Sequence, residues 1–131
     1  MKTVIKIFLY PVPVFAVFIP LALWSDIFIR YPWMDIPFHL AGGASVAASA
    51  AVMLGYLIKN RHLLKLPAAF FVLFIVGVVA IIAIGWEFFE YSLQMLFPSD
   101  MAMTLSDTLG DLAVGLLGGA VATFFASKRR S

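Results

Sequence analysis

The sequence contains no cysteine, and only 12% of its 131 residues are charged. The absence of cysteine excludes disulfides, thiolate metal sites and cysteine nucleophiles, so any metal would bind to oxygen and imidazole ligands. The charged fraction is about half of the roughly 25% that is typical of soluble domains, whereas 63% of the residues are hydrophobic. Phosphate-binding glycine loops, serine nucleophile elbows and zinc-protease helices are also missing from the sequence. This composition predicts an integral membrane protein without a separate soluble domain.

Four apolar stretches are each long enough to cross a bilayer. They run over about residues 7–29, 36–58, 68–97 and 109–126, and a helix needs about 20 residues to span the hydrocarbon. We therefore predict an all-α integral membrane protein in which residues 1–131 form a single domain of four transmembrane helices. The third stretch is the longest, which indicates a tilted or protruding helix.

The first stretch contains three prolines, Pro11, Pro13 and Pro20. Proline removes a helical hydrogen bond, so we expect a kinked helix whose freed backbone groups find partners on neighbouring helices. The alternative is a cleaved signal peptide, because lysines precede the apolar run. No small-x-small cleavage site precedes Trp24, which favours the retained helix.

The positive charges predict the orientation of the chain. In the four-span arrangement, eight of the nine Lys and Arg residues lie on one side and only Arg30 lies on the other. Such a bias in short loops marks the cytoplasmic side. We therefore expect the protein in the inner membrane of the cell, with both termini and loop 59–65 in the cytoplasm. All acidic residues are expected on the external or periplasmic side. The basic groups are interpreted as topology signals and contacts for anionic lipids, not as a nucleic-acid site.

Six polar residues form three pairs at helical spacing near the outer ends of the last three spans. The pairs are Asp35 with His39, Glu87 with Glu90, and Asp107 with Asp111. Residues three or four apart share a helix face, and ionisable side chains inside a membrane are costly and mark functional sites. If the helices pack side by side, an inner tier of His39, Glu87 and Asp111 lies beneath an outer tier of Asp35, Glu90 and Asp107.

Small residues predict which of these helices are in close contact. Gly115 and Gly119 form a small-xxx-small pattern on the fourth span, and residues 42–51 of the second span are all Gly, Ala, Ser or Val. Such residues let helix backbones approach one another in a membrane. Tight packing of the second and fourth spans would place His39 beside Asp111.

Five carboxylates and one imidazole, with only Arg30 as a local counter-charge, cannot all stay ionised in a poorly hydrated site. Either several carboxyl groups are protonated or a divalent metal ion binds among them. These residue types admit Mg²⁺, Ca²⁺ or Mn²⁺, and the histidine also admits Zn²⁺ or Fe²⁺. We predict a catalytic general base at Glu90 and metal ligands at Asp35, His39, Glu87, Asp107 and Asp111. Simple helix capping is the alternative role for Asp35 and Asp107.

Three segments resemble the VanZ-like proteins and the related YjdF-type inner-membrane proteins. They are Asp35-Ile-Pro-Phe-His39-Leu-Ala-Gly42, Trp86-Glu87-Phe-Phe-Glu90-Tyr91 and Asp107-Thr-Leu-Gly-Asp111-Leu-Ala-Val-Gly115-Leu-Leu-Gly118. The resemblance covers roughly residues 31–120 and implies a small helical membrane protein. The chain departs from the pattern at Gly115, where the resemblance implies Asn. One branch of these families is linked to glycopeptide-antibiotic tolerance, and the resemblance implies no particular reaction.

Three hypotheses about function follow from the acidic and histidine residues. The first is a metal-dependent enzyme that acts on a lipid-linked or phosphorylated substrate at the outer leaflet. The second is a cation- or proton-coupled transport or sensing protein, which would need a homo-oligomer or a large rearrangement because all the acids lie in the outer half. The third is an accessory membrane protein in which a metal holds three helices together.

Overall fold

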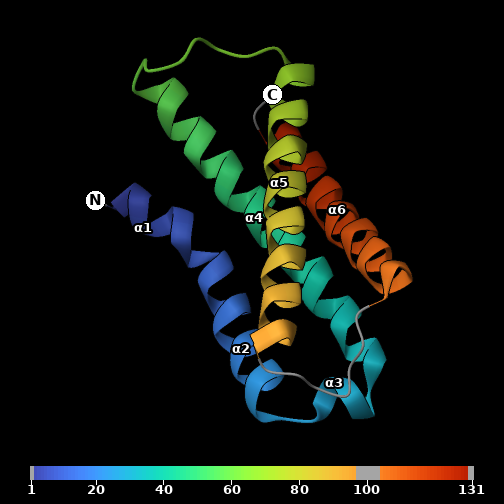
Figure 1. The fold of residues 1–131 in the computed structure, drawn as a ribbon. Helices are drawn as coiled ribbons and strands as arrows, with labels where there is room; N and C mark the ends of the chain where they lie inside the picture. The colour runs from blue at the N-terminus through green and yellow to red at the C-terminus, as the bar shows by residue number, and fades with distance from the viewer. Residues whose placement is uncertain (1, 97–103, 130–131) are drawn as a thin grey trace.

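The computed structural model describes residues 2–96 and 104–129, and these residues form a helical bundle (Figure 1). The elements are α1 (Lys2–Leu9), α2 (Pro11–Trp24), α3 (Ile27–Arg30), the 3₁₀ helix η1 (Pro32–Met34), α4 (Asp35–Lys59), α5 (Ala68–Leu96) and α6 (Leu105–Lys128). Four stretches are long and apolar enough to cross a membrane, namely Ile5–Ala22, Pro32–Lys59, Ala68–Leu96 and Leu105–Lys128. The predicted all-α architecture with four spans is confirmed.

The first span differs from the predicted single helix over residues 7–29. The helix is interrupted at Tyr10, and α2 ends at Trp24, five residues early. Ser25 has extended backbone angles, φ −134° and ψ 149°, and its hydroxyl oxygen lies 2.5 Å from the carbonyl oxygen of Leu21 and 3.4 Å from the amide nitrogen of Ile27. A serine hydroxyl that bonds nearby backbone competes with helix continuation. The chain therefore turns there and forms α3 as a separate short helix.

A neighbouring helix supplies a partner for a backbone group that proline leaves free. In a regular helix the carbonyl of Ile7 would accept from the amide of residue 11, but Pro11 has no N–H group. The hydroxyl of Ser49 on α4 donates to the Ile7 carbonyl at 2.6 Å. The expected compensation for the kink is thus confirmed at this position, and it ties α1 to α4.

The other spans begin and end close to their predicted positions. α4 extends the predicted span by one residue at each end, and α5 begins at Ala68 as expected. Its predicted end at Phe97 lies outside the described residues. α6 begins at Leu105, four residues early, because Thr104 caps it: the Thr104 hydroxyl accepts from the amide of Asp107 at 3.2 Å.

α4 and α6 form the most extensive helix contact of the bundle. In Figure 1, α4 passes behind α5, and α6 lies beside it on the right. A Cβ atom added to Gly43 would collide with the backbone carbonyl of Gly115, and one added to Gly118 would collide with the backbone of Leu40. The predicted tight packing of the second and fourth spans is confirmed. It depends on Gly43 of α4 and Gly118 of α6, whereas a Cβ atom on Gly115 would make only ordinary contacts. The other predicted small residue, Gly119, faces Val79 of α5 instead of α4.

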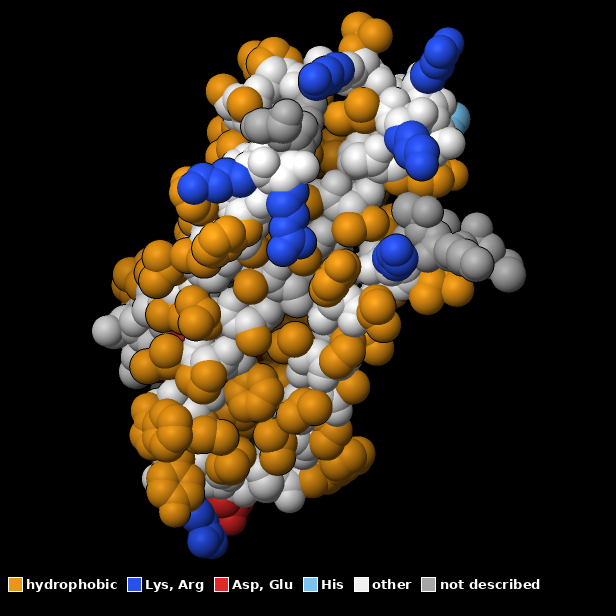
Figure 2. Space-filling view, turned by 180° about the vertical axis from the view of Figure 1, so that it is seen from behind, with side chains coloured by type: hydrophobic (Ala, Val, Ile, Leu, Met, Phe, Trp, Pro, Cys, Tyr) orange, Lys and Arg blue, Asp and Glu red, His pale blue; other side chains and the backbone are white. Residues whose placement is uncertain are grey.

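The apolar core lies between α4, α5 and α6, towards their basic ends. Leu54, Ile75 and Val79 are fully buried there. Large apolar side chains cover the outside of the helices, as they must in contact with lipid. Figure 2 shows the Lys and Arg side chains gathered mostly at one end of the molecule, with acidic side chains at the other. The cytoplasmic location of the termini stays a prediction.

Candidate metal centre

The chain direction of three helices brings the polar pairs to the same end of the bundle. Asp35 and His39 lie in the first turns of α4, and Asp111 lies in the second turn of α6. Glu87 and Glu90 lie near the end of α5, which runs in the opposite direction. The two residues of each pair are one helical turn apart, so both can face the same neighbouring helices.

The imidazole of His39 is the centre of the cluster. Its Nε2 atom lies 3.3 Å from Asp35 Oδ1, 3.9 Å from Asp111 Oδ1 and 4.0 Å from Glu90 Oε2. Its Nδ1 atom lies 3.9 Å from Glu87 Oε1. Four carboxylates from three helices therefore surround one imidazole ring.

The buried members of this cluster have unused hydrogen-bonding capacity. The side chains of His39 and Glu87 are each 8% exposed. No hydrogen bond of regular geometry reaches either carboxylate oxygen of Glu87, and the same is true of His39 Nε2 and Asp35 Oδ1, although these two atoms lie 3.3 Å apart. Buried polar atoms without partners are uncommon in folded proteins and call for a physical explanation, such as an ion.

Two overlapping triads have the spacing of metal ligands. One consists of Asp35, His39 and Asp111, and the other of His39, Glu87 and Glu90; within each, one ligand atom per residue lies within 4.8 Å of the others. His39 belongs to both triads, so one ion near the imidazole is within reach of carboxylates from all three helices. The donors are oxygen and nitrogen atoms, which suit divalent metal ions.

The predicted inner tier of His39, Glu87 and Asp111 does come together, and so do Asp35 and Glu90 of the outer tier. Asp107 is the exception. Its side chain is exposed, its amide receives the Thr104 cap, and it belongs to neither triad. Its position matches the capping alternative. The predicted counter-charge, Arg30, lies instead 3.9 Å from Asp26, and both side chains are largely exposed.

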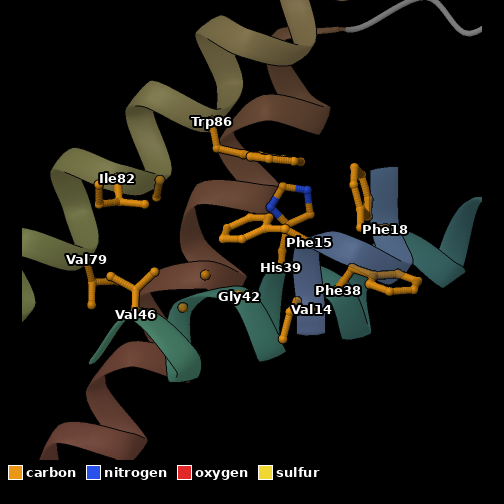
Figure 3. Close-up of a pocket in the computed structure, with 13 residues that line it drawn as sticks. Val14, Phe15, Phe18, Phe38, His39, Gly42, Val46, Val79, Ile82 and Trp86 are labelled. Atoms are coloured by element: carbon orange, nitrogen blue, oxygen red, sulfur yellow. The ribbon is translucent and has the colours of Figure 1, made fainter. Parts of the chain in front are cut away.

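A small apolar cavity, which the sequence did not predict, lies beside His39. It has a volume of about 40 Å³ and lies between α2, α4 and α5. Its wall includes the rings of Phe15, Phe18 and Trp86. The Trp86 ring centroid lies 4.9 Å from that of Phe15 and 5.1 Å from that of Phe18. Figure 3 shows the His39 ring among these aromatic side chains. The one sequence signal was the position of Trp86 directly before Glu87.

The fold and the cluster define a small four-span membrane protein with a buried histidine-carboxylate group. Residues 3–131 match the model of a family described as predicted membrane protein, DUF2238, so the chain belongs to this family. No curated protein and no solved structure matches the chain. The family description names no activity, and the resemblance to VanZ-like and YjdF-type proteins stays a prediction.

Proposed function

We propose that this protein binds a divalent metal ion between α4, α5 and α6, with His39, Asp35, Asp111 and Glu87 as the ligands and the Glu90 carboxylate beside them. The proposal rests on the buried environment of the Glu87 carboxylate. No hydrogen bond of regular geometry reaches either of its buried oxygens, and the side chain faces His39. A bound cation supplies the missing partner for these oxygens.

The electrostatic argument favours a cation. An isolated ionised carboxylate in a poorly hydrated site is strongly disfavoured, and here three further carboxylates lie within 4.0 Å of the same imidazole. Each ionised neighbour raises the cost of ionising the next. A divalent ion offsets two negative charges and attracts the others, so it stabilises the whole group at once.

The spacing of the donors fits such an ion after a small contraction. With metal–ligand bonds of about 2.1 Å, adjacent ligand atoms are about 3.0–3.4 Å apart. The atoms around His39 Nε2 lie 3.3–4.0 Å from it, so shifts of a few tenths of an ångström suffice. A set of carboxylates with one imidazole suits Mn²⁺, Zn²⁺ or Fe²⁺.

We extend the proposal to an enzyme acting on a lipid-linked or phosphorylated substrate at the outer leaflet. A metal ion polarises a phosphoryl or carbonyl oxygen and activates water, and Glu90 serves as the general base. One observation supports this extension. Glu90 is more exposed than Glu87, at 19% against 8%, so its carboxylate is the more accessible of the two to a substrate. The three motifs that resemble VanZ-like and YjdF-type proteins contain these four ligands and Glu90.

Transport is less well supported by the rest of the bundle. Among the described residues, the buried polar side chains outside the cluster are Ser45, Ser49 and Thr123. Each of these hydroxyls donates to a backbone carbonyl. Groups engaged in this way offer a proton or an ion no continuous path through the core.

The test is elemental analysis of detergent-purified protein after dialysis against metal-free buffer and reloading. We expect a near-stoichiometric divalent metal in the wild type and its loss in Glu87→Gln and Asp111→Asn. The matched control is Asp107→Asn, which removes a carboxylate one turn from Asp111 but outside both triads, and it should retain the metal. A folded wild type that binds no metal would refute the proposal. Equal loss in Asp107→Asn would show a diffuse acidic attraction in place of a defined site.

The enzymatic extension has its own test. Metal-loaded protein should release phosphate from polyprenyl or phospholipid phosphates, and Glu90→Gln should keep the metal while losing turnover. Loss of metal in Glu90→Gln would instead assign Glu90 as a ligand. No turnover across such a panel with metal bound would contradict the extension and leave the metal site standing.

A further inference from the structure

A second cavity lies at the end of the bundle opposite to the metal centre. It has a volume of about 350 Å³ and lies between the ends of α4 and α6 and the start of α5. Its wall carries three cationic residues, Lys59, Lys65 and Arg129, and its apolar part includes Gly55 and Phe71. Pockets for small-molecule ligands begin at about 300 Å³, so the space is large enough for a ligand group.

No acidic side chain of the described residues pairs with the cations of this cavity. The sequence contains no Asp or Glu between residues 36 and 86 or after Asp111. Within residues 2–96 and 104–129, none of the ion pairs involves Lys59, Lys65 or Arg129. The cavity therefore carries three cationic side chains that no acidic side chain of the described residues neutralises.

The apolar part of the cavity reaches the outside of α4 at Gly55. This glycine is exposed, and a Cβ atom built on it meets no atom within 4 Å. The buried ring of Phe71 on α5 forms another part of the wall. A ligand that fits both parts has an anionic headgroup and an apolar chain.

We propose that this cavity binds an anionic phospholipid, with the phosphate held by Lys59, Lys65 and Arg129 and an acyl chain lying along Gly55 and Phe71. Basic pockets between transmembrane helices are suited to anionic headgroups. The site is independent of the metal centre, because the two share no residue. Such a lipid would lie in the leaflet opposite to the metal centre.

The experiment is native mass spectrometry of the full-length protein in detergent, with phosphatidylglycerol and phosphatidylcholine of identical acyl chains in competition. We expect the wild type to retain phosphatidylglycerol in preference to phosphatidylcholine. Replacing Lys59, Lys65 and Arg129 with Gln should weaken retention by about fivefold for each charge removed. A wild type without headgroup preference would overturn the proposal.

A matched control separates a defined site from general surface charge. Lys6, Arg61 and Lys128 do not line the cavity, and the Lys128 ammonium instead lies 4.5 Å from the ring centroid of Phe124. Their joint replacement by Gln removes the same charge and should leave the preference unchanged. An equal loss in this control would overturn the proposal.

A second variant keeps every charge and changes only the space. Gly55→Leu adds a side chain to the cavity wall at a point where its Cβ atom meets no atom within 4 Å. It should reduce phosphatidylglycerol retention while its thermal unfolding in detergent stays like that of the wild type. Unchanged retention would overturn the assignment of the cavity. Inorganic phosphate tests the chemistry of the ligand: stabilisation of the wild type by phosphate alone to the same extent as by phosphatidylglycerol would overturn the lipid as occupant.

Discussion

Replacing Gly43 with alanine should separate α4 from α6 and disable the metal centre without touching a ligand. The added Cβ atom would collide with the carbonyl oxygen of Gly115 and lie 2.7 Å from its carbonyl carbon. An ordinary van der Waals contact of a Cβ atom begins at 3.4 Å, so the two backbones must move apart by at least about 0.7 Å. Protein interiors are close-packed, so the surrounding side chains must shift as well. Overpacking of this kind costs about 1–3 kcal/mol.

The displacement acts directly on the metal ligands. Gly43 lies one turn below His39 on α4, and Gly115 lies one turn below Asp111 on α6. The distance from His39 Nε2 to Asp111 Oδ1 is 3.9 Å and must already contract around an ion. Metal sites tolerate deviations of about 0.2 Å in ligand distance, so a further separation of the helices should release the metal from Asp111.

The assay combines metal analysis with thermal unfolding in detergent. Gly42→Ala is the control, because the neighbouring Gly42 has nothing within 4 Å of an added Cβ and alanine favours the helix. We expect Gly43→Ala to lose metal and to unfold at a lower temperature, and Gly42→Ala to keep both properties. If the two variants bind metal and unfold alike, the close α4–α6 crossing does not set the geometry of the centre.

Two further predictions concern the first span and the orientation. Ser49→Ala should destabilise the protein by about 0.6–1 kcal/mol, because the Ile7 carbonyl loses its hydrogen-bond donor. Pro11→Ala should reduce that cost, because it restores the amide that bonds the Ile7 carbonyl within the helix. Additive effects in the double variant would contradict the idea that Ser49 replaces the missing amide of Pro11. The absence of cysteine makes single-cysteine labelling clean: Asp26→Cys should react with a membrane-impermeant thiol reagent in intact cells and Arg61→Cys only after lysis, and the reverse pattern would overturn the predicted orientation.

The polar pairs show what local spacing alone predicts. Helical spacing is a property of the chain itself, so Glu87 and Glu90 share a face of α5 in any helical fold. The same rule pairs Asp107 with Asp111, yet only Asp111 reaches the cluster, because Thr104 starts the helix early and leaves Asp107 in an exposed first turn. Spacing predicts the face of a residue, whereas depth depends on where the helix begins and on what covers it.

The sequence by itself determined the membrane class, the four spans and the segregation of charge, because these depend on composition and on the length of apolar runs. Its small residues also indicated the contact between α4 and α6, where a side chain on Gly43 or Gly118 would collide with the backbone of the facing helix. Only the tertiary structure decided that His39 is the centre of the cluster, that Arg30 lies outside it and that two cavities open at opposite ends. Those features depend on the relative rotation and offset of helices, which are set by contacts between residues far apart in the chain.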